Sequence, residues 1–323
     1  MSELARVLDS GDGELAIAPE LIDAARDFAK NSKAASTIQK YRGDWQRFAA
    51  WCATRQLDAL PATPATVALY ATALATSSKK VTTIARALVS ISQAHKAAGH
   101  ASPVSSAAVH EVMRGIKRKL GVARTKKSPV LIDDLRRFVG KFSKTTSGLR
   151  NRALLVVGFA GALRRAELVA LDVSDVRFTR EGLEVTIRRS KTDQEGAGQK
   201  IGLPFGNHVE TCPVRTLEAW LTVSAIKEGA IFRSCSSRGK IGPRLSDRDV
   251  ARIVKKACLA CGFDPTLYAG HSLRRGFATT AARAGKTERD IMRQTRHRSP
   301  MMVREYIEDA GIFEDNPASG IGL

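Results

Sequence analysis

The sequence lacks any apolar run close to the roughly 20 residues that span a bilayer, and its N-terminus lacks the pattern of a signal peptide. These absences predict a cytoplasmic protein with no membrane partner. The sequence also contains no internal repeat and no low-complexity segment. With 43% hydrophobic and 26% charged residues, its composition is typical of a globular protein rather than a disordered one.

The cysteines do not form a disulfide framework or a metal-binding pattern. There are five of them, an odd number with no framework spacing, so structural disulfides are not expected. Cys258 and Cys261 have C-x-x-C spacing, but a zinc site would need a second ligand pair, and none stands nearby. Their segment is typical of a helix that ends at Gly262, so both are interpreted as small core residues. No metal or other cofactor is expected.

Acidic residues are scarce, with 32 Asp and Glu against 52 Lys and Arg and a formal net charge of +20. Residues 1–30 hold seven acidic and three basic side chains, whereas residues 31–150 hold five acidic and 21 basic ones. A basic stretch that coincides with expected helices indicates a surface for a polyanion. Nucleic acid is the favoured polyanion, and a membrane surface or a merely solubilising charge excess is less favoured. In a bacterium the protein is therefore expected to be nucleoid-associated.

The length of 323 residues predicts two domains. Residues 1–30 are expected to form an acidic tail and a short amphipathic helix. Residues 31–121 have apolar side chains at intervals of three and four, which predicts a bundle of four amphipathic helices. Thr63 followed by Pro64 is typical of a helix start, because threonine caps the first turn and proline fits its first position.

Residues 122–129 have no periodic apolar pattern and are predicted to be a basic linker that lets two domains close around a duplex. The expected DNA contacts from the bundle and this linker are Arg86, Arg114, Lys117, Arg118, Arg124, Lys126 and Lys127.

Residues 130–323 are predicted to form a mostly helical second domain with one small sheet. Residues 150–171 are too apolar for a surface helix and are expected to form its buried centre, ending just after Arg164 and Glu167. Alternation in residues 183–187 and again at 201 and 203 predicts two strands of a hairpin.

Six residues of this domain have side chains that suit one reaction. They are Arg164, Lys191, His271, Arg274, His297 and Tyr306. Five can carry positive charge or donate a proton, and the sixth is a phenol, so together they describe a site where a tyrosine attacks a phosphodiester. Singly, each has an ordinary interpretation, since a lone tyrosine on an amphipathic helix usually belongs to the core. Their conjunction favours the catalytic interpretation.

Each residue type has a chemical reason to be there. The transition state spreads negative charge over the non-bridging oxygens, which guanidinium groups fit in bidentate fashion, so Arg164 and Arg274 are expected to clamp one phosphate. His297 is expected to donate a further hydrogen bond. The leaving alkoxide needs a proton, for which Lys191 is the expected source, and the phenol must lose one, for which His271 is the expected base.

The residues around these six carry a family resemblance. The local sequences are GALRRAEL at 161–168, RSKT at 189–192, HSLRRG at 271–276 and HRSP at 297–300, with Tyr306 nine residues after His297. In order, spacing and neighbours they resemble the tyrosine recombinase (phage integrase) family, over nearly the whole chain. Matching positions in that family hold two arginines, a general-acid lysine, two histidines and the nucleophile. Glu167 matches an acidic position that orients the first arginine.

The resemblance implies a mainly α, α+β protein: a SAM-like core-binding bundle in a Cre-like arrangement, then a helical catalytic domain with a small antiparallel sheet. It implies site-specific recombination of double-stranded DNA through a 3′-phosphotyrosyl intermediate, without ATP or metal. A homotetramer would hold two duplexes, with the segment beyond Tyr306 docked on a neighbouring protomer. His297 stands where Cre has a tryptophan, but histidine is common in the wider family.

Two alternatives remain open from the sequence. A type IB topoisomerase has a closely similar site but rejoins the same strand; the separate N-terminal bundle favours a recombinase. A catalytically inactive DNA-binding relative is disfavoured because no site position is missing. The sequence does not indicate the target DNA or any accessory protein.

Overall fold

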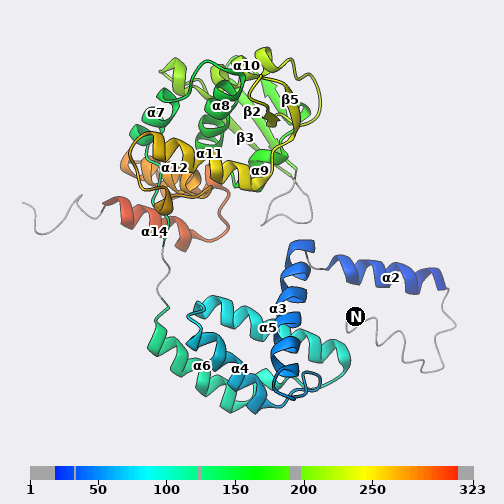
Figure 1. Cartoon of the computed structure of the whole chain (residues 1–323). Coiled ribbons are helices and arrows are strands. Elements are labelled where there is room, and N and C mark those ends of the chain that lie inside the picture. Colours follow the sequence, from blue (N-terminus) through cyan, green and yellow to red (C-terminus); the bar gives the residue numbers. More distant parts are fainter. Residues whose placement is uncertain (1–18, 33, 123–125, 189–197, 312–323) are drawn as a thin grey trace, which may run out of the picture. The chain divides into compact units, whose positions relative to one another are not determined.

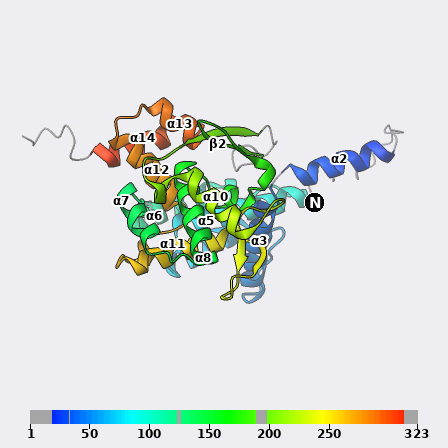
Figure 2. The same cartoon turned by 90° about the horizontal axis from the view of Figure 1, so that it is seen from above.

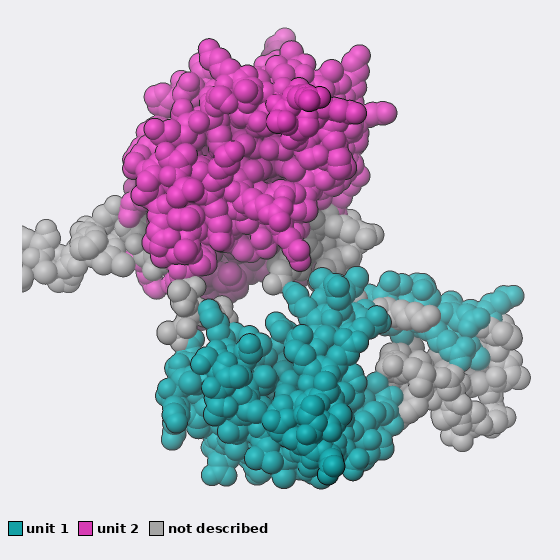
Figure 3. Space-filling view, viewed as in Figure 1, with its two compact units in different colours: residues 1–125 teal, residues 126–323 magenta. Residues whose placement is uncertain are grey.

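The computed structural model describes residues 19–32, 34–122, 126–188 and 198–311 (Figure 1). The chain divides into two compact units, residues 1–125 and 126–323 (Figure 3). Some residues named in the sequence predictions lie outside the described residues, namely Arg124, Lys191 and residues 312–323 of the tail. The domain boundaries predicted from the sequence stay a prediction.

The described part of the first unit is helical. Its helices are α2 (Pro19–Asn31), α3 (Ala35–Ala53), α4 (Pro64–Thr76), α5 (Val81–Ala98) and α6 (Ala107–Leu120). The last four match the four helices expected from the sequence. The cap at Thr63 is present, since its side chain accepts a hydrogen bond from the Thr66 N–H (3.1 Å). Helix α3 packs on α5 and α4 on α6 around a core that includes Phe48 and Ile84.

The second unit is mostly helical with two small sheets. Its helices are α7 (Ile132–Gly140), α8 (Thr146–Ala160), α9 (Arg165–Ala170), α10 (Pro213–Ser224), α11 (Asp247–Ala260), α12 (Ser272–Arg283), α13 (Glu288–Thr295) and α14 (Pro300–Gly311). Helix α8 lies in the middle and packs against α7, α9, α10, α11 and α12 (Figure 1). Helices α12, α13 and α14 pack against one another, and α13 and α14 lie together in the second view (Figure 2).

The strands confirm the alternation seen in the sequence. β1 (Val176–Phe178), β2 (Gly182–Ile187) and β3 (Gln199–Pro204) form an antiparallel sheet in that order. Leu183 pairs with Leu203 and Val185 with Ile201, and all four side chains are buried. A second sheet pairs β4 (Arg233–Cys235) with β5 (Ile241–Arg244). The expected mainly α fold with a small antiparallel sheet is thus confirmed.

The buried segment 150–171 is divided, which the sequence did not predict. Most of α8 is buried, as expected, but the helix stops at Ala160, and α9 begins at Arg165. Ala162 between them has a φ of 45°, a left-handed conformation that an alanine rarely adopts. Arg164 therefore caps a new helix instead of continuing the old one. Apolar periodicity runs through both helices, so it could not reveal the break.

Part of the expected linker lies on the second unit. The Ser128 N–H donates to Leu267 O (2.8 Å) and the Val130 N–H to Ser272 O (3.0 Å). A Cβ atom at Gly276 would stand 1.8 Å from Val130 O, so only glycine permits this approach. Gly276, the last residue of the sequence HSLRRG, thus allows the backbone at Val130 to pack directly against α12.

Cys258 and Cys261 belong to the core of the second unit, as interpreted from the sequence. All five cysteines are free; Cys258 is fully buried, and Cys261 packs against the core. Burial raises the pKa of the Cys258 thiol to about 12. None of the helices in the described ranges is long and apolar enough to cross a membrane.

Candidate active site

The second unit brings four of the six predicted residues together. Arg164 caps α9, Arg274 lies in the first turn of α12, His297 follows α13, and Tyr306 lies on α14. Tyr306 and His297 are neighbours, with ring centroids 5.9 Å apart. His271 precedes α12 and is exposed. Lys191 lies outside the described residues.

The C-terminal end of α8 forms one wall of this site. The last carbonyl groups of a helix have no partner within it, and the negative end of its dipole attracts cations. Here side chains supply the bonds: Gln294 Nε2 donates to Ala160 O (2.9 Å), Arg296 Nη1 to Gly161 O (3.0 Å) and Arg274 Nη1 to Ala162 O (2.7 Å). The site arginines are therefore held against a fixed backbone edge.

Glu167 binds two arginines beside the C-terminal end of α8. Its Oε1 accepts from Arg164 Nη1 (2.6 Å), and its Oε2 accepts from the Arg164 backbone N–H (2.9 Å) and from Arg296 Nη2 (2.9 Å). Burial by itself would raise the pKa of Glu167, but the charges of Arg296 and Arg164 and these hydrogen bonds hold it below its usual value. The carboxylate is therefore ionised and fixes the Arg164 side chain.

Arg274 is buried with an unused donor. Its Nη1 is bonded to Ala162 O, but its Nη2 has no hydrogen-bond partner among the described residues. Burial and the charges of Arg164 and Arg296 lower the pKa of Arg274 to about 9, so it remains a cation at neutral pH. A buried cation with a free N–H group suits an anionic oxygen.

His297 is held in one tautomer. The Thr295 hydroxyl donates its only proton to Ile291 O (2.6 Å), so it accepts a hydrogen bond from His297 Nδ1 (2.8 Å). Burial, together with the charges of Arg274, Arg164 and Arg296, lowers the pKa of His297 to about 3. The ring is therefore neutral in the free protein, with a lone pair on Nε2. It can donate from Nε2 only after taking up a proton, which an arriving anion favours.

Tyr306 is half-buried in a small apolar cluster with Ala278, Ile291 and Val303. The Arg275 guanidinium lies 5.8 Å from the centre of its ring, and Arg275 Nη1 also donates to Lys127 O (3.0 Å). The tyrosine is thus positioned by both α12 and α14.

The described residues of the site carry an excess of positive charge. Arg164, Arg274 and Arg296 face one carboxylate, that of Glu167, which leaves two positive charges. A phosphodiester carries one negative charge, and its transition state carries about two. The arrangement therefore suits a phosphate at the transition state better than in the ground state.

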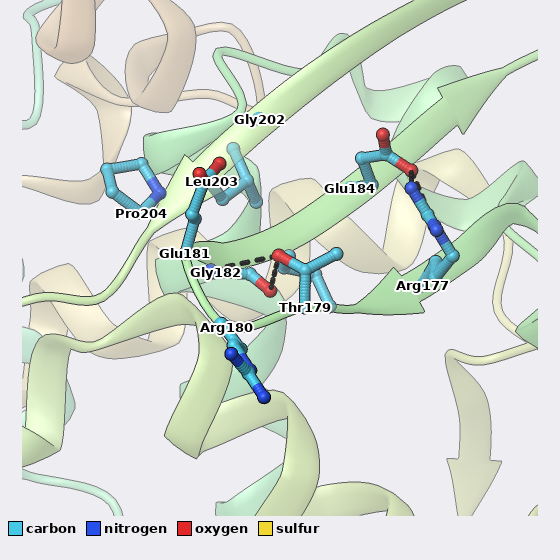
Figure 4. A pocket seen from close by; sticks show the side chains of 10 residues that line it. Arg177, Thr179, Arg180, Glu181, Gly182, Glu184, Gly202, Leu203 and Pro204 are labelled. Atoms are coloured by element: carbon cyan, nitrogen blue, oxygen red, sulfur yellow. Dashed lines mark hydrogen bonds and ion pairs between the residues drawn. The ribbon is translucent and has the colours of Figure 1, made fainter.

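Two cavities lie near the sheet. One of about 770 Å³ is lined by His297, Arg298, Arg289 of α13 and Lys200 of β3, so it opens beside the site and is basic. The other, of about 520 Å³, lies at the turn from β1 to β2 (Figure 4). It contains none of the predicted catalytic residues, and its Arg177 is already paired with Glu184 (2.7 Å).

The predicted DNA contacts have different surroundings. Arg114, Lys117 and Arg118 are exposed on α6, whose buried residues are Val109, Met113 and Ile116. Arg86 instead donates to the buried carboxylate of Asp44 (2.6 Å). Lys126 forms an ion pair with Glu305, and Lys127 Nζ donates to Thr266 O (2.5 Å).

Sequence reasoning missed three residues of the site: Gln294, Thr295 and Arg296. They immediately precede His297, and their side chains contact the α8 carbonyls, His297 and Glu167 respectively. The one signal in the sequence that could have found these three residues is their position directly before His297.

Comparisons with known proteins identify the family of the chain. The phage integrase family model matches residues 131–311. The chain is 41% identical over 292 residues to an integrase/recombinase XerD homolog of Selenomonas ruminantium, covering 89% of this chain and 85% of the relative. It is 27% identical over 283 residues to recombinase Cre of Escherichia phage P1, covering 81% of this chain and 80% of Cre.

Solved structures share the fold. A Tn1549 transposon integrase in complex with transposon right end DNA has a TM-score of 0.60 at 16% identity, covering 89% of this chain and 95% of the integrase. A lambda integrase dimer bound to a core site has a TM-score of 0.59 at 18% identity, covering 90% of this chain and 95% of that one. The fold is that of a tyrosine recombinase catalytic domain. The chain belongs to the phage integrase family, and it is an enzyme of site-specific DNA cleavage and rejoining.

Proposed function

We propose that Tyr306 is the nucleophile and that Arg164, Arg274 and His297 bind the scissile phosphate. The phenolic oxygen of Tyr306 attacks phosphorus while the bond from phosphorus to the 5′ oxygen breaks. The phenolic proton passes to a base, for which His271 remains the candidate. The leaving 5′ oxygen takes a proton from Lys191, giving a 3′-phosphotyrosyl link and a 5′-hydroxyl.

One observation supports this assignment above the others. The buried Nη2 of Arg274 has no partner in the described part of the chain, and it belongs to the same site as Arg164, His297 and Tyr306. A phosphate oxygen would satisfy it. A 5′-hydroxyl from another strand then reverses the step, and the covalent link conserves the bond energy, so neither ATP nor a metal is chemically needed.

Mapping the covalent adduct tests the assignment. The purified protein is incubated with DNA of its own genome, adducts are isolated under denaturing conditions, and both the DNA and the attached peptide are sequenced. The chain has four tyrosines, and cleavage by trypsin after Arg304 leaves Tyr306 as the one tyrosine of the C-terminal peptide. We expect the nucleotide on that peptide. A nucleotide attached to Tyr41, Tyr70 or Tyr268, or no adduct at all, would contradict the proposal.

We further propose that the protein acts as a homotetramer on two duplexes in the cytoplasm, associated with the nucleoid. The exposed basic face of α6, with Arg114, Lys117 and Arg118, would contact phosphates. The relaxing activity of a topoisomerase is not favoured, because the relatives that the chain matches over most of its length are recombinases.

The tail 311–323 is proposed to dock on a neighbouring protomer. It contains Ile312, Phe313, Ile321 and Leu323, apolar side chains that stabilise a contact only when they are buried. Deleting residues 311–323 is expected to preserve binding to one site and to abolish the complex of two duplexes and recombination. Gel shifts with one and with two sites measure this. If the truncated protein still forms the complex of two duplexes, the tail does not dock on a neighbouring protomer. Loss of all DNA binding would indicate misfolding.

A further inference from the structure

Arg296 is a buried arginine that no part of the predicted mechanism uses. Its side chain is 3% exposed, although arginine is among the residues least often buried. Its backbone has a φ of 57°, the left-handed conformation that commonly ends a helix and that favours glycine there. A residue in an unfavourable conformation persists where its surroundings hold it, and such residues concentrate at functional sites.

The side chain of Arg296 joins two segments that are far apart in sequence, residues 161–167 and residues 294–296. Nη1 donates to Gly161 O (3.0 Å) and to Gln294 O (2.8 Å), while Nη2 donates to Ala162 O (3.2 Å) and to Glu167 Oε2 (2.9 Å). The turn between α8 and α9 is thereby bonded to the residue that directly precedes His297.

Arg296 and Arg164 share the same carboxylate. With both arginines present, the single charge of Glu167 is opposed by two cations. Without Arg296, the buried Glu167 would be opposed by Arg164 alone, and its charge would cancel that of the arginine expected to hold the phosphate.

We propose that Arg296 is a positioning residue for the recombination reaction: it neutralises Glu167, which leaves the charge of Arg164 for the phosphate, and it fixes His297 beside Tyr306. This inference rests on the proposed function, because it concerns the same phosphate. Arg296 acts through Glu167 and His297 and need not touch DNA.

The charges around His297 agree with this role. Arg274, Arg164 and Arg296 all lower the pKa of the ring, and Glu167 opposes them. Removing Arg296 is therefore expected to raise the pH at which His297 takes up a proton. A residue with a purely structural role elsewhere in the fold would not change that pH.

The first test compares three variants on the target DNA recovered by adduct mapping. Arg296→Met keeps much of the side-chain volume but removes the charge and the hydrogen bonds; Arg296→Lys keeps the charge but loses the forked geometry. Arg252→Met is the matched control, because Arg252 is an exposed arginine with a similar partner, Asp249 (3.0 Å). The measurements are the rate of adduct formation on a nicked duplex, the melting temperature, and the titration of His297 by NMR.

We expect Arg296→Met to form the adduct at least about 10-fold more slowly, as when an outer partner of a catalytic group is removed. His297 should titrate at a higher pH in this variant but not in Arg296→Lys, and the control should match the unchanged protein. An adduct rate within about 2-fold of the unchanged protein, or an unaltered titration of His297, overturns the proposal.

A double variant separates charge from folding. Arg296→Met leaves Glu167 under-compensated in the interior and could unfold the unit. Glu167→Gln with Arg296→Met removes both charges, keeps an oxygen for Arg164, and restores two positive charges to the site. We expect it to form the adduct faster than Arg296→Met alone. Recovery of the melting temperature without recovery of the rate would show a merely structural role and overturn the proposal.

Failure of the proposed function would look different. If the unchanged protein forms no adduct through Tyr306, the assignment of the nucleophile fails. The titration of His297 needs no DNA, so it still reports whether Arg296 sets the charge of the site.

Discussion

Tyr306→Phe is expected to abolish the covalent DNA adduct while leaving binding of the target DNA near normal. The phenolic oxygen is the attacking atom, and phenylalanine has no oxygen in its place, so the loss should be complete within detection. The aromatic ring and its place over Arg275 and beside His297 are kept. Affinity depends mainly on phosphate contacts, to which this hydroxyl contributes little. Denaturing gels with a nicked suicide substrate measure the adduct, and gel shifts measure binding.

A second tyrosine provides the control. Tyr268 is buried, with its ring against Phe263 (5.8 Å) and Phe138 (6.3 Å), so Tyr268→Phe keeps this packing. It should form the adduct as the unchanged protein does. An adduct that persists in Tyr306→Phe would refute the assignment of the nucleophile.

Lys191→Ala is expected to slow cleavage of ordinary DNA by about 10²- to 10⁴-fold, the usual contribution of a positioned general acid. The same variant should cleave nearly normally when sulfur replaces the 5′ bridging oxygen, because a thiolate leaves without being protonated. The measurement is the rate of adduct formation on the two matched substrates.

The rescue distinguishes the role of the lysine from mere binding. Lys256→Ala removes an exposed lysine of α11, far from the site in sequence, and should cleave both substrates at the normal rate. If Lys191→Ala is equally impaired on oxygen and on sulfur, the lysine has some role other than protonating the leaving group.

Much of the fold could be predicted because its signals are local. Side chains at intervals of three and four indicated helices α3 to α6, and the Thr63 cap is made by atoms three residues apart. Alternation indicated β2 and β3, whose buried residues pair as expected. The identity of the reactive groups was also evident, because phosphoryl transfer to a phenol needs arginines, proton donors and a tyrosine.

The break at Ala162 could not be predicted. Gly161, which ends α8, is not left-handed itself; the next residue, Ala162, is, and alanine is a good helix former flanked by an apolar pattern on both sides. The consequence is functional. The break exposes the carbonyl groups of Gly161 and Ala162 that hold Arg274 and Arg296. It also turns Arg164 from a helix-interior residue into a cap bonded to Glu167.

The sequence by itself determined the family, helices α3 to α6, strands β2 and β3, and the chemical types in the site, since these depend on residue identity and short-range spacing. Tertiary structure alone decided which cations act together. Arg296 is one of 52 basic residues in the sequence, and it becomes part of the site because it bonds groups up to 135 residues away. Burial then keeps His297 neutral, both by desolvating its ring and by strengthening the repulsion from the nearby arginines. The hydrogen bond to Thr295 selects the tautomer of His297. Desolvation depends on packing from every side, and no local pattern encodes it.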